Sequence, residues 1–242
     1  MIDSCQELTT AGETADFFGE ENFNRIQGIM YPKQIARGAF LFWEGDLADK
    51  LYYIRSGQIH LTKSTAEGKD LILSILQKGD LIGEIDGSEE TLHSFSALAV
   101  EAVDIGVIHK KDLDILLYRH GEFAIQFIKW MGVAHRSTQS KFRDLLLFGK
   151  PGALASTLIR MSNTYGEKHG NGIHLKLKLT NSELADLIGT SREGVNRILN
   201  TLKIEGTISL EKGQIIIHRI EDLRKMCNCP TFPTCPVNIC RL

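Results

Sequence analysis

The stretch 179–203 limits the fold of this chain more than any other part, because its pattern is that of a helix-turn-helix. Two Thr-x-x-Glu pairs predict capping boxes at the starts of two successive helices: Thr180 with Glu183, and Thr190 with Glu193. Ala185 is small enough for the position where the helices cross, and Gly189 suits a tight turn with positive φ. The stretch therefore predicts two short helices joined by a sharp turn.

The second of these helices has two contrasting faces. Its apolar face, predicted to pack on the first helix, consists of Val195, Ile198, Leu199 and Leu202. Its polar face consists of Arg192, Glu193, Asn196, Arg197 and Asn200. Guanidinium groups can fork onto guanine O6 and N7, and a carboxylate can accept a hydrogen bond from cytosine N4. The polar face therefore predicts binding to double-stranded DNA.

The charge distribution favours a chain in which one part binds the phosphates of a nucleic acid and the other part does not. Residues 141–226 carry 14 Lys and Arg against 9 Asp and Glu, whereas residues 1–140 carry 13 against 21. No apolar run has the length of a membrane span, and the start MIDSCQELTT lacks a basic segment followed by an apolar one. We therefore expect a cytoplasmic protein, away from membranes, with reduced thiols.

The first half of the chain alternates short apolar runs with glycines. Between residues 29 and 108, β-branched and aromatic residues are separated at turn-like intervals by Gly38, Gly45, Gly57, Gly68, Gly79 and Gly83. This pattern predicts an antiparallel β-roll, a sensor-like domain over residues 20–120.

A long helix is predicted over residues 121–148, where no proline interrupts an approximate helical spacing of apolar residues. These residues are Phe123, Phe127, Trp130, Met131, Ala134, Phe142 and Leu145. We expect the stripe to pack partly on the roll and, in its C-terminal half, on a second subunit.

A DNA-binding domain is predicted over residues 149–226, with a boundary marked by Pro151 and Gly152. Its further elements are predicted to be a helix over 153–165, a loop over 169–172 and a hairpin wing around Lys212-Gly213. The expected fold class is α+β, with a cysteine-rich tail over residues 227–242.

In this order and at this length, the roll, long helix and winged helix-turn-helix resemble the CRP/FNR family of bacterial transcription regulators. The most specific segment is Ser191-Arg192-Glu193 followed by Arg197, and the resemblance covers nearly the whole chain. It implies a homodimer that reads a palindrome of TGTGA-type half-sites through these residues and Asn196, and an activator that works with RNA polymerase.

A barrel enzyme of cupin type is disfavoured, because it needs paired histidines and His60, His93 and His109 are scattered.

Members of the family that bind cyclic nucleotides hold the cyclic phosphate with an Arg and a Ser after a Gly-Glu pair. Here Gly83-Glu84 is present, but His93 stands where the Arg would, followed by Ser94. An imidazole cannot replace the bidentate grip of a guanidinium, so a cyclic nucleotide is disfavoured as a ligand. Haem, which a single histidine could ligate, and another small ligand in the roll remain open.

Four of the five cysteines lie in the tail CNCPTFPTCPVNICRL: Cys227, Cys229, Cys235 and Cys240. In a cytosolic protein, clustered cysteines with interleaved prolines predict a metal or an iron–sulfur cluster rather than disulfides. Zinc, closed by four thiolates, is one alternative, and thiol oxidation is another.

The tail resembles that of the Bacillus-type FNR regulators, oxygen sensors whose 4Fe–4S cluster is held by C-terminal cysteines. The ending CP-x-x-IC-R places Cys235 and Cys240 on two ligand positions, whereas the N-terminus supplies only Cys5. A third thiolate is assigned to Cys229, with Cys227 as the alternative, because the spacing upstream differs from the family pattern. The segment QSKFRDLLLFGKPGAL places the fourth, aspartate ligand of this type on Asp144. The resemblance thus implies control of anaerobic gene expression through cluster occupancy.

Overall fold

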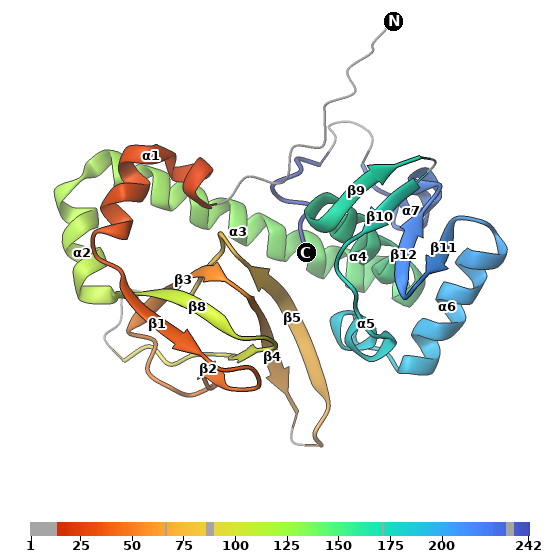
Figure 1. Ribbon diagram of the computed structural model, residues 1–242, viewed down its shortest axis with the longest axis horizontal. Coiled ribbons are helices and arrows are strands. Elements are labelled where there is room, and N and C mark those ends of the chain that lie inside the picture. Colours follow the sequence, from red (N-terminus) through yellow and green to blue (C-terminus); the bar gives the residue numbers. More distant parts are fainter. Residues whose placement is uncertain (1–13, 66, 86–89, 171, 231–234) are drawn as a thin grey trace, which may run out of the picture. The chain divides into compact units, whose positions relative to one another are not determined.

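The computed structural model describes residues 14–65, 67–85, 90–170, 172–230 and 235–242. They belong to two compact units, Gly12–Gly132 and Val133–Leu242, so the division falls within the long helix α3 (Gly121–Leu147). The predicted α+β class is confirmed, with an antiparallel roll before α3 and a winged helix-turn-helix after it (Figure 1). Within the described ranges, none of the helices combines the length and the apolar character that crossing a membrane requires.

Two four-stranded antiparallel sheets form the roll, in the orders β1-β8-β3-β6 and β2-β7-β4-β5. The strands are β1 (Tyr31–Ile35), β2 (Phe40–Phe42), β3 (Lys50–Ser56), β4 (Gln58–Ser64), β5 (Asp70–Gln77), β6 (Leu81–Ile82), β7 (Ser96–Ala99) and β8 (Val103–His109). Alternate side chains of these strands form one apolar core that includes the fully buried Ile54, Ile59 and Ile105. The core explains why the β-branched residues recur between the glycines.

Two helices of the roll were not predicted from the sequence, namely α1 (Thr14–Gln27) and α2 (Lys110–Arg119). A second apolar cluster joins them to Phe123 and Phe127 of α3 and to Leu51 and Ile108 of the sheet β1-β8-β3-β6. The first part of α3 therefore packs on its own roll, as the sequence predicts.

The C-terminal unit combines helices with a four-stranded sheet in the order β11-β12-β10-β9. Its elements are α4 (Gly149–Tyr165), β9 (Gly166–His169), β10 (Gly172–Leu175), α5 (Asn181–Ile188), α6 (Arg192–Ile204), β11 (Ile208–Glu211), β12 (Gln214–Ile217) and α7 (Ile220–Met226). The predicted wing is confirmed as the hairpin β11–β12, whose turn residues Lys212 and Gly213 have φ values of 49° and 79°.

In this unit, the helix predicted over 153–165 is confirmed as part of α4 with an earlier start, whereas the loop predicted over 169–172 was wrong. The helix expected from residue 153 begins at Gly149, because Pro151 lies in its first turn, where no intrahelical N–H is needed. At the loop expected over 169–172, strands β9 and β10 form a hairpin instead. This hairpin adds two strands to the sheet that contains β11 and β12.

Candidate DNA interface and metal site

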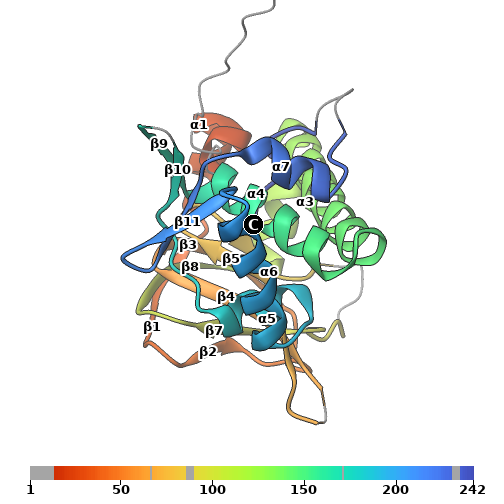
Figure 2. The same cartoon turned by 90° about the vertical axis from the view of Figure 1, so that its right-hand side faces the viewer.

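The helix α6 has one packed face and one exposed face. Val195, Leu199 and Leu202 are buried, and Ile198 is half-buried. The residues predicted to face DNA are all exposed, namely Arg192, Glu193, Asn196, Arg197 and Asn200. The predicted amphipathic division of α6 is confirmed, and Figure 2 shows α6 beside α5.

The start of α6 differs from the prediction by one residue. Ser191, rather than Thr190, is the N-cap, because the Gly194 N–H donates to Ser191 Oγ at 3.1 Å. The predicted capping box of Thr190 with Glu193 is therefore wrong. Main-chain hydrogen bonding at this helix start, together with Ser191, lowers the pKa of Glu193 below its usual value. Its carboxyl group is therefore an acceptor at neutral pH.

The preceding helix α5 has the predicted capping box. The Thr180 N–H donates to Glu183 Oε2 at 2.7 Å, and the Glu183 N–H donates to Thr180 Oγ1 at 3.2 Å. Gly189 ends α5 with φ 62°, as the turn requires. Asn181 Nδ2 donates to the side-chain oxygen of Asn196, so the two helices share a polar contact on the exposed side.

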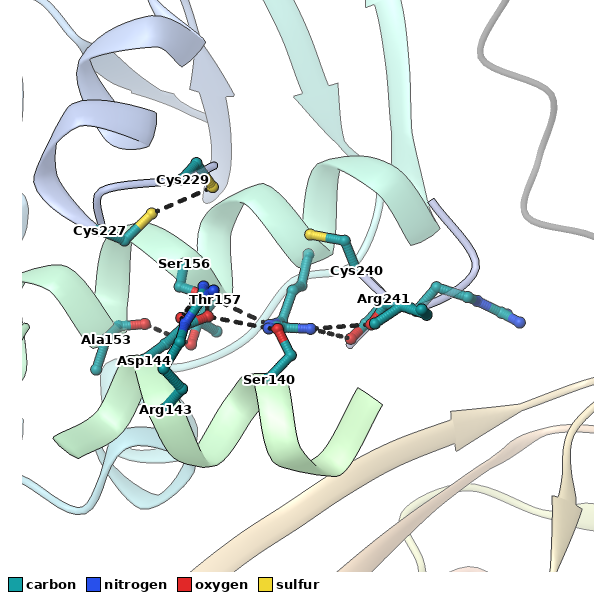
Figure 3. Close-up of polar contacts among 12 residues, drawn as sticks. Ser140, Arg143, Asp144, Ala153, Ser156, Thr157, Cys227, Cys229, Cys240 and Arg241 are labelled. Atoms are coloured by element: carbon teal, nitrogen blue, oxygen red, sulfur yellow. Dashed lines mark hydrogen bonds and ion pairs between the residues drawn. The ribbon is translucent and has the colours of Figure 1, made fainter. Parts of the chain in front are cut away.

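The cysteine-rich tail begins where α7 ends. Cys227 is fully buried, and its Sγ donates to the Leu223 carbonyl at 3.3 Å. The Sγ atoms of Cys227 and Cys229 are 3.6 Å apart (Figure 3). Cys235 and Cys240 are half-buried. Cys5 lies outside the described residues.

The thiols of the tail differ in acidity. The hydrogen bond between Cys227 and Cys229 raises the pKa of Cys227 well above its usual range and lowers the pKa of Cys229 to about 7. Burial raises the pKa of Cys240 to about 11, although the Arg160 guanidinium opposes the shift, and negative charge on Cys235, Cys229 and Asp144 adds to the rise. Cys229 is thus the more acidic thiol of the pair, and Cys227 is fully buried.

Asp144 lies near the C-terminal end of α3 and is only 4% exposed. Its Oδ1 accepts from Arg143 Nε at 2.8 Å, and its Oδ2 accepts from Ser156 Oγ at 2.5 Å and from Arg160 Nη2 at 3.0 Å. Read from the sequence without the family resemblance, Asp144 is an ordinary helix carboxylate beside Lys141 and Arg143. The structure instead places it in a buried ion pair with α4.

The donors near Asp144 have the chemistry of an iron–sulfur or zinc site, with four thiols and one buried carboxylate. Arg160 bonds to Asp144 and to the carbonyls of Ile239 and Arg241, so Asp144 and the main chain on either side of Cys240 share one neighbourhood. Among the residues that the structure describes, no three ligand-type side chains lie close enough to hold a metal ion. The residues fit such a group by chemistry and neighbourhood, but their side chains are not in ligating positions.

Sequence reasoning missed the α4 residues that surround this site, above all Arg160. Arg160 is 3% exposed and contacts both Asp144 and the tail. A signal for it exists in the sequence, because Arg160 interrupts the apolar run of Leu158, Ile159 and Met161. A buried guanidinium in such a run needs several partners, and the sequence alone does not say where they are.

The roll contains a second group of polar residues where the family resemblance places a cyclic phosphate. Glu84 Oε2 accepts from the Ser94 N–H at 2.7 Å, and Ser94 Oγ donates to Glu84 Oε1. His93 is buried, stacks on Phe42 with ring centroids 3.6 Å apart, and has its Nδ1 3.3 Å from Glu84 Oε2. The carboxylate of Glu84 therefore occupies donors that an anionic ligand would need.

A cavity of about 440 Å³ opens in the roll beside Phe42, the ring on which His93 stacks. Its lining carries charges of both signs, and Lys50 Nζ lies 2.7 Å from Asp49 Oδ1. Burial raises the pKa of Tyr52, another lining residue, to about 12. The charged groups in this cavity partly neutralise one another.

The roll, the long helix and the exposed face of α6 define a winged-helix transcription regulator with a sensor-like N-terminal domain. Residues 32–120 match the cyclic nucleotide-binding domain family, and residues 152–226 match the Crp-like helix-turn-helix domain family. The chain belongs to the CRP/FNR family of transcription regulators, as its sequence motifs indicate, and it is a DNA-binding regulator rather than an enzyme.

Within this family, the chain is 40% identical over 237 residues to the anaerobic regulatory protein of Bacillus subtilis (strain 168), covering 97% of this chain and 98% of that protein. It is 27% identical over 196 residues to the CRP-like cAMP-activated global transcriptional regulator of Mycobacterium tuberculosis (strain ATCC 25618 / H37Rv), covering 81% and 88%. The structure of a CooA mutant from Carboxydothermus hydrogenoformans has the same fold, with a TM-score of 0.75, 20% identity and coverage of 91% and 98%.

Proposed function

We propose that this chain is a cytoplasmic, oxygen-responsive regulator that binds specific DNA as a homodimer when it carries a 4Fe–4S cluster, and so controls anaerobic gene expression. The observation that carries the proposal is that Arg160 bonds both to Asp144 and to the tail carbonyls on either side of Cys240, in a tail that contains four thiols. Its relation to an anaerobic regulatory protein over 97% of the chain supports the same function.

The proposed cluster ligands are Cys229, Cys235, Cys240 and Asp144. Burial favours Cys229 over Cys227 as the third thiolate, because Cys227 is fully buried and its Sγ donates to the Leu223 carbonyl, whereas Cys229 is half-buried. When bound, a 4Fe–4S cluster supplies sensitivity to oxygen through its own redox chemistry. The protein residues would hold the cluster between the end of α3 and the tail that follows α7.

The proposed DNA target is a palindrome of TGTGA-type half-sites. Arg192, Glu193, Asn196 and Arg197 are exposed on α6, where side chains can reach base edges. Ser191 caps the helix and is assigned to DNA contact through its position at the helix start. RNA polymerase is the proposed protein partner of the DNA-bound dimer.

The proposed dimer contact is the exposed apolar side of α3. Its C-terminal part exposes Phe142, Leu146 and Leu147, and its first part exposes Ile125, Ile128 and Met131. Large exposed apolar groups along one long helix favour a second helix as partner.

We also propose that the roll does not bind a cyclic nucleotide. The contacts of Glu84 with Ser94, and the imidazole of His93 in place of a guanidinium, support this assignment. A zinc-bound regulator is the second candidate for the tail, because four described thiols occur together near the C-terminus.

One preparation separates these candidates. Protein purified without oxygen should be brown, contain iron and sulfide in equal amounts, and bind a TGTGA palindrome in preference to scrambled DNA. Exposure to air should remove both the visible absorption and the preference. Colourless protein that contains zinc would establish the second candidate, and cluster-loaded protein with equal affinity for both DNAs would contradict the first.

A further inference from the structure

Arg160 is a buried charge whose five hydrogen bonds join three segments of the C-terminal unit. Its Nη2 donates to Ser140 Oγ at 2.8 Å and to Asp144 Oδ2 at 3.0 Å, both on α3. Its Nε donates to Ser156 Oγ at 3.3 Å, on α4. Its Nη1 donates to the main-chain carbonyls of Ile239 at 3.2 Å and Arg241 at 3.4 Å. One guanidinium therefore contacts α3, α4 and the tail.

Other α4 side chains hold the same part of the tail. Asn163 Nδ2 donates to the Cys240 carbonyl at 2.8 Å, and Thr164 Oγ1 accepts from the Leu242 N–H at 3.2 Å. The carbonyl groups of residues 239, 240 and 241 are thus all bonded to α4. The side chains of Ile239 and Leu242 are buried on either side of Cys240.

These bonds fix the main chain of Cys240 without using its thiol. They also fix the carboxylate of Asp144 through the same guanidinium that binds the tail. A planar guanidinium has donors in a rigid fork, so it can hold groups on two sides at set angles, whereas a lysine ammonium cannot. A salt bridge between α3 and α4 alone would not require the contacts with the Ile239 and Arg241 carbonyls.

We propose that Arg160 is a positioning residue for the C-terminal cysteine site. It docks residues 239–241 on α4 and holds Asp144 beside them in the protein that carries no cluster. Cys240 and Asp144 are therefore brought together before metal arrives, and assembly of the site needs less ordering of the tail. The part of this inference that concerns the cluster rests on the proposed function, whereas the docking of the tail does not.

The docking is tested on cluster-free, full-length protein. In Arg160→Lys, the alkylation rate of Cys240 and the amide hydrogen exchange of residues 239–242 should rise about tenfold or more, because a lysine ammonium lacks the fork that holds Asp144 and the two tail carbonyls at the same time. Asn163→Ala, which leaves Asp144 untouched, should give a smaller rise confined to the tail. The matched control is Arg224→Lys, an exposed α7 residue paired with Glu221, which should leave Cys240 alkylation at the wild-type rate.

The outcomes distinguish this inference from the proposed function. Wild-type rates of hydrogen exchange and of Cys240 alkylation in both Arg160→Lys and Asn163→Ala would overturn the docking. If Arg160→Lys unfolds, the milder Asn163→Ala still tests the docking. If the wild type takes up iron and sulfide, Arg160→Lys should reconstitute its visible absorption severalfold more slowly, and an unchanged rate would overturn the positioning role. If the wild type takes up no iron while the variant loses tail protection, the proposed function fails and the docking stands.

Discussion

Arg160 Nη2 and Asp144 Oδ2 lie 3.0 Å apart in a buried ion pair that joins α4 to α3. Both side chains are nearly inaccessible to solvent, because only 4% of the Arg160 side chain and 6% of the Asp144 side chain are exposed. Asp144 is therefore a structural partner of a buried cation as well as the proposed fourth cluster ligand. Substitutions at Asp144 must be designed to separate these two roles.

Asp144→Ala should destabilise the C-terminal unit by about 3–5 kcal/mol, because it leaves the Arg160 guanidinium buried without its counter-charge. Asp144→Asn should cost less, since the amide oxygen can still accept from Arg160 and Ser156. Denaturant unfolding of the cluster-free proteins measures both values. A loss below about 0.5 kcal/mol in the alanine variant, the range of ordinary surface changes, would contradict a buried ion pair.

Asp144→Asn also tests the ligand role, because it preserves most of the packing while removing the negative charge. We expect anaerobic Asp144→Asn to hold less iron than the wild type, or to lose its visible absorption faster in air. Iron analysis and the decay rate in air are the measurements. Wild-type values for both would remove Asp144 from the ligand set and direct the search to Cys227.

Replacing cysteines one at a time should divide them into two groups. Cys229→Ser, Cys235→Ser and Cys240→Ser should each abolish the visible absorption of the anaerobic protein and its preference for specific DNA. Cys227→Ala should keep the absorption and cost about 1 kcal/mol in stability, because it removes a buried sulfur atom. Cys5→Ser is the control and should behave as wild type. If Cys229→Ser keeps the visible absorption and Cys227→Ala loses it, the third thiolate is Cys227 and not Cys229.

Arg192→Ala should weaken binding of the cluster-loaded dimer to a TGTGA palindrome by about 1–3 kcal/mol per half-site and relax the preference at one guanine. Binding to scrambled DNA should change much less, because phosphate contacts elsewhere remain. Titrations of both DNAs at one fixed salt concentration measure the difference. An equal loss on the two DNAs would make Arg192 a phosphate contact and not a base contact.

The stability of the roll should depend on pH through His93. Burial lowers the pKa of His93 below its ordinary value of 6.5, although Glu84 opposes the shift. In the unfolded chain His93 takes up a proton as pH falls through 6.5, whereas in the folded roll it stays neutral to lower pH, so stability is lost as pH falls below about 6.5. The unfolding free energies of wild type and His93→Gln, measured between pH 5 and 8, should differ in slope there. Equal slopes for the two proteins over this pH range would contradict the lowered pKa of His93.

The local elements were predictable wherever a short pattern carries its own physical reason. The helix pair α5 and α6 follows from the Thr180–Glu183 capping box, Gly189 and the apolar spacing of Val195 and Leu199. The wing follows from Lys212-Gly213. The predicted cap at Thr190 was wrong because Ser191 competes for the same role one residue later. Local patterns thus identify elements well and their ends less well.

The amino-acid sequence by itself determined the α+β class, the order of roll, long helix and winged helix, the polar face of α6 and the clustering of cysteines in the tail. Each of these depends on residues close together in the chain. Only the tertiary structure decided that Arg160 bonds to Ser140, Asp144 and the carbonyl of Ile239, since the last pair is 79 positions apart in sequence. A buried charge is stable only where folding brings several distant partners to it, so its partners follow from packing and not from local pattern.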